Sequence, residues 1–162
     1  MKGRILIACV GNIFLGDDAF GVEVARRLSN EELPEHVVVK DFGIRSYDLA
    51  YALMENWDLS ILVDAVSQGG EPGTVYVIEP DTTSIAKHEV SLDAHSMNPV
   101  SVIQLVHELG GGVGRMLVVG CEPATIDDNG QFGLSEPAQA AVAEAVTAIK
   151  DLVATNNRAT AA

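Results

Sequence analysis

The residues whose types could do chemistry are acids placed just after apolar runs. Asp17 and Asp18 follow the run Ile5–Val10 after a Gly-Asn turn, and Asp64 directly follows the run 59–63. Carboxylates that meet an imidazole make a ligand set for a borderline divalent ion such as zinc or nickel, with positions left open for a substrate. The sequence therefore raises the hypothesis of a metal-contacting site.

Histidines could supply the imidazole. The polar segment 79–97 contains His88, Asp93 and His95, and precedes a predicted helix. Long segments without structure of their own tend to be functional. His95 is favoured over His88, and His107, on the outer face of its predicted helix, is the weakest candidate.

Each acid also has a structural interpretation. Asp17 is favoured as a cap on the free amides of the helix that follows it, rather than as a ligand. Asp18 is evenly balanced between a ligand and a surface acid that complements the helix dipole. Asp64 is favoured as functional, because an acid at the tip of a buried strand needs a compensating partner.

A phosphate site is disfavoured at the first loop. Gly11, Gly16 and Gly21 are spaced five apart and match neither the dinucleotide-binding fingerprint nor a P-loop. Asp17 and Asp18 already stand at the positive end of the helix dipole. This loop should repel a phosphate and attract a cation or an amine.

The elements that must position these residues form an alternating pattern. Unbroken apolar runs predict buried strands, and apolar residues at 3.6 spacing, such as Gly21, Val24, Ala25 and Leu28, predict helices packed on a sheet. Ser46 and Asn98 are predicted helix caps, and 41–45 is a predicted loop. The predicted strands are 5–10, 37–40, 59–63, 74–78 and 116–119, and the predicted helices cover 21–28, 46–57, 99–109 and 137–153.

The order of these elements predicts a three-layer α/β fold. The linker 67–73 is too short for a parallel crossover, so the fourth strand should run antiparallel. Ligands of such sheets bind at the carboxyl ends of the strands where the strand order reverses; if the second and third strands lie on opposite sides of the first, this point falls between the first and third strands. We expect a single domain over 1–154 and a frayed tail over 155–162.

The composition limits the partners. Ten Lys and Arg against 23 Asp and Glu give a formal net charge of −13, which argues against nucleic acid and anionic membranes. Cys9 and Cys121 fall in predicted buried strands and are interpreted as core thiols. We expect a cytoplasmic protein, since the N-terminus lacks a signal-peptide cleavage pattern and no stretch is apolar enough for a membrane span.

At these residues the sequence resembles the [NiFe]-hydrogenase maturation endopeptidases, which remove a C-terminal extension from the hydrogenase large subunit after nickel is loaded. Two features differ from the family pattern: Ala19 stands where the family commonly has glycine, and Asp41-Phe-Gly-Ile-Arg45 lacks the usual Gly-Thr. The similar features are Gly11-Asn12, Gly16-Asp17-Asp18-x-x-Gly21, Val63-Asp64-Ala65, His95 before a helix, Gly120 before Glu122-Pro123, and Leu134-Ser135.

The resemblance implies a fold and a site. The fold is a three-layer α/β/α sandwich of the phosphorylase/hydrolase-like type, with a five-stranded mixed sheet of order 2-1-3-5-4 and strand 4 antiparallel. The implied catalytic and metal-contacting residues are Asp18, Asp64 and His95. The implied partner is the hydrogenase large subunit precursor, which carries the nickel, with zinc or cadmium able to substitute. We expect a monomeric, metal-dependent endopeptidase of aspartic type.

Three other functions stay open. A nickel-checking chaperone would use the same residues without cutting. A nucleoside or nucleotide enzyme of the same fold would need basic residues around a phosphate, and only Lys40 and Arg45 stand near predicted strand ends. An autonomous metallopeptidase would need a more preorganised metal site than three ligands on loops provide.

Overall fold

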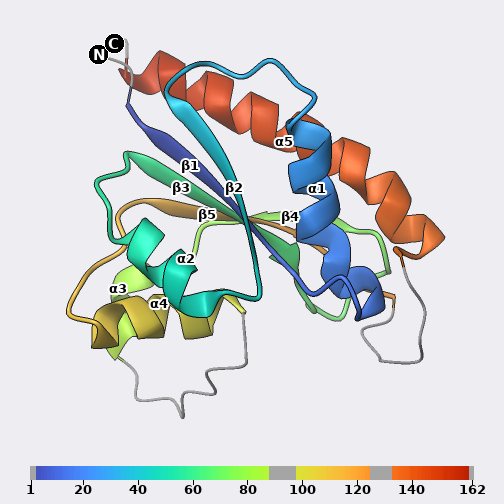
Figure 1. The fold of residues 1–162 in the computed structure, drawn as a ribbon, viewed down its shortest axis with the longest axis horizontal. Coiled ribbons are helices and arrows are strands. Elements are labelled where there is room, and N and C mark those ends of the chain that lie inside the picture. The colour runs from blue at the N-terminus through green and yellow to red at the C-terminus, as the bar shows by residue number, and fades with distance from the viewer. Residues whose placement is uncertain (1–2, 88–97, 125–132, 161–162) are drawn as a thin grey trace.

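The chain folds as one five-stranded sheet between two layers of helices (Figure 1). The structure, a computed structural model, describes residues 3–87, 98–124 and 133–160. The strand order is β2-β1-β3-β5-β4, as the resemblance implied. The strands are β1 (Ile5–Val10), β2 (Val37–Gly43), β3 (Leu59–Ala65), β4 (Val75–Ile78) and β5 (Met116–Cys121).

The strand directions agree with the sequence pattern. β1 pairs in parallel with β2 and β3, β3 pairs in parallel with β5, and β4 runs antiparallel to β5. Every residue of β1 and β5 is buried, as is typical of strands covered on both faces. β2 and β4 are the edge strands, and most of their residues are partly buried or exposed.

Helices cover both faces of the sheet (Figure 1). One layer is α1 with α5, and the other is α2 with α4, against which α3 packs. A short 3-10 helix, η1, leads into α1. The bounds are η1 (Gly16–Ala19), α1 (Phe20–Leu28), α2 (Ser46–Leu53), α3 (Thr82–Lys87), α4 (Pro99–Glu108) and α5 (Glu136–Thr160).

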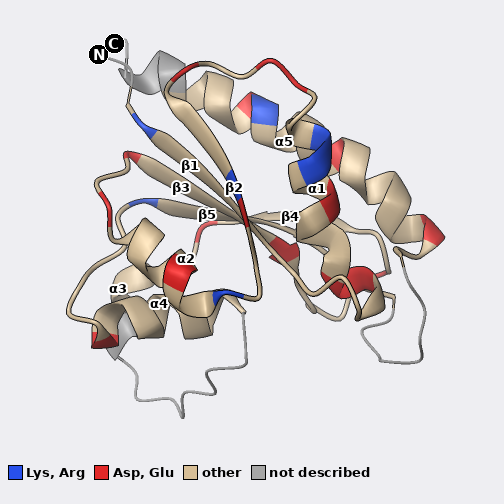
Figure 2. Ribbon diagram, viewed as in Figure 1, with Lys and Arg blue, Asp and Glu red and all other residues tan. Residues whose placement is uncertain are grey.

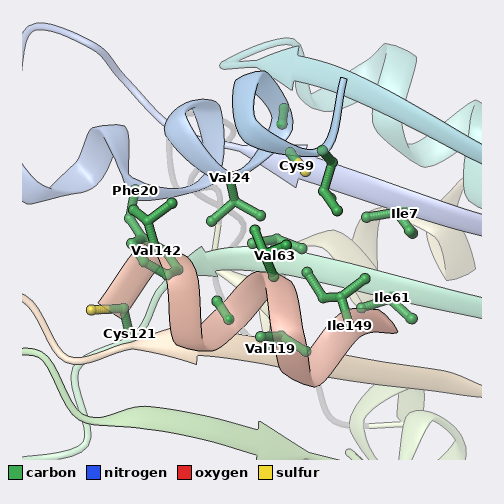
Figure 3. Packing of buried hydrophobic residues seen from close by; sticks show 14 of the residues in the cluster. Ile7, Cys9, Phe20, Val24, Ile61, Val63, Val119, Cys121, Val142 and Ile149 are labelled. Carbon is green, nitrogen blue, oxygen red and sulfur yellow. The ribbon is translucent and has the colours of Figure 1, made fainter. Parts of the chain in front are cut away.

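The core has two halves because side chains alternate across each strand. Leu6, Leu62 and Val118 point to the layer of α2 and α4. The residues between them point to the layer of α1 and α5 (Figure 3). That second half includes Ile7, Cys9, Ile61, Val63, Val119 and Cys121 from the strands, and Phe20, Val24, Val142 and Ile149 from the helices.

Gly21 sets the position of α1 on the sheet. A Cβ atom at this position would collide with the carbonyl oxygen of Val10 and lie 2.7 Å from the carbonyl oxygen of Val63. The helix therefore rests directly on the carboxyl ends of β1 and β3. This close approach places η1 and its two acids at that edge of the sheet.

The bounds of β2 and α2 differ from the prediction. β2 continues to Gly43, so Asp41 belongs to the strand and not to a loop; its carboxylate accepts a 2.9 Å hydrogen bond from the Gly43 N–H. The predicted cap at Ser46 is wrong, because Ser46 is the first residue of α2 and Arg45 occupies the N-cap position. The helix ends at Leu53, before the predicted end at residue 57.

Three further segments are longer or more regular than predicted. The stretch expected to be irregular from residue 79 contains α3, whose first turn is capped by the Asp81 carboxylate at 3.0 Å from the Ser84 N–H. β5 extends to Cys121. α5 continues to Thr160, so most of the predicted tail is helical.

Charged side chains lie mainly on the surface. Lys and Arg are scattered over separate elements (Figure 2). Among the described residues, four of them make ion pairs with acids, of which the shortest joins Lys150 and Glu31 at 2.9 Å. In the part of the chain that the structure describes, no helix combines the length and the hydropathy needed to span a membrane.

Candidate functional site

A cavity of about 750 Å³ opens at the carboxyl ends of the central strands. β2 and β3 lie on opposite sides of β1, so the strand order reverses here, as the sequence predicted. Asp18 and Asp64 both line this cavity. The other lining residues are Gly11, Asn12, Leu15, Ile44, Ala65, Val66, Ser67, Gln68, Ile78, Pro80, Asn98, Pro99, Val100, Ser101 and Val118.

Asp64 is the more buried of the two acids. It is the penultimate residue of β3, only 4% exposed, and its Oδ1 accepts a 2.8 Å hydrogen bond from the Ala65 N–H. Burial raises the pKa of Asp64 well above its ordinary value, and the negative charge of Asp18 raises it further. A positive charge entering the cavity would relieve both effects.

Asp18 enters the cavity from η1. The side chain is half-buried, and its Oδ2 accepts a 3.1 Å hydrogen bond from the Asn12 N–H. Burial raises the pKa of Asp18, while this hydrogen bond lowers it. η1 and β3 thus bring two acids 46 positions apart in the sequence into one cavity.

The cavity has an acidic lining without basic partners. None of the described residues that line it is Lys or Arg. Arg45 instead holds the turn between β2 and α2, where its Nη2 donates to the Asp41 carbonyl at 2.7 Å and its Nε to the Phe42 carbonyl at 3.2 Å. Lys40 lies over the Phe42 ring, 5.7 Å from its centroid. The two cations named for a phosphate site are therefore engaged elsewhere.

The third predicted site residue, His95, lies outside the described residues, as do His88 and Asp93. Within the described ranges, no group of three or more His, Cys, Asp or Glu side chains could hold a metal ion. The helix that follows this segment begins as predicted: Asn98 caps α4, its Oδ1 accepting from the Ser101 N–H at 2.9 Å. The start of α4 forms one wall of the cavity.

Comparison with known proteins decides the family. A family model described as hydrogenase maturation protease matches residues 22–152. The chain belongs to the hydrogenase maturation protease family.

Relatives and solved structures match over most of their lengths. A putative hydrogenase maturation protease of Methanocaldococcus jannaschii is 36% identical over 151 residues, covering 91% of this chain and 95% of that protein. The coenzyme F420 hydrogenase subunit delta of Methanothermobacter thermautotrophicus is 33% identical over 154 residues, covering 91% and 93%. The hydrogenase maturating endopeptidase HybD of Escherichia coli superposes with a TM-score of 0.71 at 25% identity, covering 90% and 89%.

Membership in the hydrogenase maturation protease family makes this chain a peptidase and confirms the resemblance drawn from its motifs. Ala19, which stands where the family commonly has glycine, has an ordinary backbone conformation. Its φ of −77° and ψ of 0° are accessible to any residue, so glycine is not required there.

Asp17 does not cap its own helix, contrary to the sequence interpretation. It is 1% exposed, and neither η1 nor α1 has a side-chain cap. Its Oδ1 accepts from the Ser135 N–H at 2.7 Å. Its Oδ2 accepts from the Ala124 N–H and from the Ser135 Oγ–H, both at 2.7 Å. In this member of the family, Asp17 joins η1 to the segment just before α5.

Glu122 is a buried acid whose role the sequence analysis missed. It is 4% exposed and follows β5 directly. Both of its carboxylate oxygens face the Gln68 N–H, at 2.8 and 3.1 Å. Its place at the tip of a buried strand is the same signal that singled out Asp64, and could have identified it.

The two cysteines are core thiols, as predicted. Both are free and buried, and neither lines the cavity. Burial raises the pKa of the Cys121 thiol to about 11, and it also raises the pKa of Cys9. A buried thiol with a raised pKa is a poor nucleophile. Neither cysteine is therefore placed to attack a substrate in the cavity.

Proposed function

We propose that this chain is the endopeptidase that removes the C-terminal extension of a [NiFe]-hydrogenase large subunit precursor after nickel has been inserted. Family membership supplies the peptidase class. The observation that carries the finer proposal is the meeting of Asp18 and Asp64 in one cavity whose described lining has no basic residue. Such a cavity favours a substrate that brings its own positive charge.

In this proposal Asp18 and Asp64 contact the nickel ion that the precursor presents. Burial raises the pKa of both acids, and the negative charge of Asp18 raises that of Asp64 further; a divalent ion bound by the two carboxylates would offset these costs. Carboxylate oxygens bind borderline divalent ions, and His95 is proposed as the third contact. Zinc or cadmium would bind to the same carboxylate oxygens. A metal ion at this place polarises a carbonyl or lowers the pKa of a water.

The cavity walls would hold the precursor's chain. A volume of about 750 Å³ lies in the range of sites that enclose small ligands, and accommodates a short peptide segment. Ile44, Val66 and Val118 give the walls apolar contact surface. These residues would exclude water around the acids, which strengthens the attraction between carboxylates and a cation.

Processing of a purified precursor tests the proposal. The protein is incubated with nickel-loaded and with nickel-free precursor, and the released C-terminal peptide is measured by mass spectrometry. We expect release only from the nickel-loaded form, and loss of release in the Asp18→Asn and Asp64→Asn variants. Equal release from both forms would refute recognition of nickel. Binding of the loaded precursor without release would instead indicate a nickel-checking chaperone.

A further inference from the structure

Two buried carboxylates lie behind the segments that carry the cavity acids. Asp17 precedes Asp18 in η1, and Glu122 accepts from the loop that follows Asp64. Neither Asp17 nor Glu122 lines the cavity. Both receive hydrogen bonds from parts of the chain far away in sequence. We call the hydrogen bonds to the Asp17 carboxylate the Asp17 fastening, and those to the Glu122 carboxylate the Glu122 fastening. Each cavity acid is thus connected to its own fastening.

The Asp17 fastening holds the position of η1. Successive side chains of a 3-10 helix point about 120° apart, so Asp17 and Asp18 face different sides of the same turn. Asp17 faces the segment before α5, and Asp18 faces the cavity. The Asp18 N–H donates to the Leu15 carbonyl at 3.0 Å, which ties the turn together. A shift of η1 away from α5 would therefore move the Asp18 carboxylate.

The Glu122 fastening holds the loop after β3. The loop leaves the strand at Ala65, whose N–H donates to Asp64. Val66 then donates its N–H to the Cys121 carbonyl at 2.9 Å, and Gln68 donates its N–H to Glu122. Ala65 and Gln68 both line the cavity. Release of Gln68 would loosen the loop that supports the Asp64 carboxylate.

The two fastenings differ in how many donors they satisfy. In the described part of the chain, three donors converge on the two oxygens of Asp17, so replacement of one oxygen by an amide NH₂ group places a donor against a donor. Among the described residues, one N–H points at the two oxygens of Glu122, so a single amide oxygen can accept it. An isosteric amide should therefore fail at Asp17 and succeed at Glu122.

We propose that Asp17 and Glu122 are positioning residues of the peptidase, which hold Asp18 and Asp64 in the geometry that cleavage needs. The proposal rests on the proposed function. A small misplacement of catalytic groups lowers the rate of the chemical step more than it weakens binding of the substrate. Loss of either fastening should therefore act mainly on kcat.

The test measures kcat and KM for cleavage of the nickel-loaded precursor, well below the unfolding temperature of each variant. Asp17→Asn and Glu122→Ala should lower kcat by about 10- to 100-fold, with KM within about threefold of wild type. Glu122→Gln should keep kcat within about threefold. Glu136→Gln, which removes an exposed acid at the start of α5, is the matched control and should also keep kcat within about threefold of wild type.

A second measurement separates positioning from folding and from the proposed function. The backbone amide resonances of Asn12 and Ala65, which donate to Asp18 and Asp64, report the two acids without any cleavage. Asp17→Asn should shift the Asn12 resonance, Glu122→Ala should shift the Ala65 resonance, and Glu122→Gln should leave both in place. If Asp17→Asn does not fold, Ser135→Ala is tested instead, because it removes one donor to Asp17. We expect a smaller loss of kcat in Ser135→Ala.

The outcomes distinguish the two proposals. A lower unfolding temperature with unchanged kcat and unchanged amide resonances would show that the two acids only stabilise the fold, and would overturn the positioning role. Equal effects of Glu122→Ala and Glu122→Gln would also overturn it for Glu122. If the wild-type protein cleaves no precursor, the proposed function fails, and the amide resonances still decide whether Asp17 and Glu122 position the acids.

Discussion

The negative charge of Asp18 raises the pKa of Asp64, although η1 and β3 deliver these two carboxylates from separate parts of the chain. Burial of Asp64 is the larger cause of its raised pKa. Two acids held together in this way favour a proton or a cation between them. The native protein therefore carries an electrostatic cost at the place where we propose that it contacts metal.

Replacing Asp64 with asparagine should stabilise the protein at neutral pH. With its pKa raised in the folded state, Asp64 binds a proton more tightly there than in the unfolded chain, where its pKa is about 3.9. The free energy of unfolding therefore falls as the pH rises from about 4 through the folded-state pKa. We expect Asp64→Asn to add roughly 1 kcal/mol at pH 7, or about 2–4 °C in Tm.

The gain from Asp64→Asn should vanish below about pH 4, where the carboxyl group is protonated in both states. Thermal unfolding followed by circular dichroism at pH 7 and pH 3.5 measures the difference. Asp151→Asn, at an exposed site on α5, is the control and should change stability by less than about 0.5 kcal/mol. A loss of stability in Asp64→Asn at pH 7 would contradict this prediction.

Processing should require the charge of Asp18. We expect Asp18→Asn to lower kcat/KM by at least about 100-fold, which corresponds to roughly 2.7 kcal/mol, because an amide contacts a cation far more weakly than a carboxylate. The rate of cleavage by the wild type should rise with pH, because the raised pKa values of Asp18 and Asp64 mean that both carboxylates form only at a higher pH. A rate that falls as the pH rises from 5 to 7 would argue against metal contact by these acids.

Ile44 should affect binding of the precursor more than its cleavage. It is 63% exposed and lines the cavity, so it offers apolar surface that the protein itself does not cover. We expect Ile44→Ser to raise KM about tenfold with little change in kcat, a loss of about 1.4 kcal/mol. Tyr51→Ser is the control, since Tyr51 is 57% exposed and does not line this cavity. Equal KM values for wild type and Ile44→Ser would exclude this contact.

Neither thiol should be needed for cleavage. Cys9 and Cys121 are buried, and both have raised pKa values. The double variant Cys9→Ala/Cys121→Ala should keep kcat within about threefold, while losing roughly 1–2 kcal/mol of stability from the small cavities that it creates. In the native wild-type protein, iodoacetamide should leave both thiols unmodified by mass spectrometry. Rapid alkylation that abolishes cleavage would point to a cysteine nucleophile.

Gly21→Ala should destabilise the packing of α1 on the sheet. The added methyl group would meet the Val10 and Val63 carbonyl oxygens, and α1 would have to move off the sheet. We expect a loss of roughly 3 kcal/mol in urea unfolding. Gly112→Ala is the matched control, because a Cβ atom there meets nothing within 4 Å. A similar stability for the two variants would refute the close approach.

The sequence predicted the centre of the fold better than its edges. β1 and β3 are unbroken apolar runs because helices cover them on both faces, so their bounds were almost fully predicted. β2 is an edge strand whose last residues include the charged Asp41, so the apolar pattern stops before the strand does. The short helix α3 was missed because no apolar stripe marks it.

Part of the candidate site could also be predicted. The rule that ligands bind where the strand order reverses correctly brought Asp18 and Asp64 to one cavity. The place of Glu122 at the tip of a buried strand could have marked it as a candidate, but the hydrogen bonds of Asp17 and Glu122 could not be predicted. Their hydrogen-bond donors lie up to 118 residues away along the chain, and local patterns carry no information about such partners.

The hydrogen bonds between Asp17 and Ser135 also bear on how the protein is made. A chain emerging from the ribosome presents its acidic turn early, but the donors that hold Asp17 come from residues 124 and 135. Until those residues leave the exit tunnel, the turn lacks its anchor. The acidic turn of a newly made molecule therefore reaches its anchored position only after the segment just before α5 has been made.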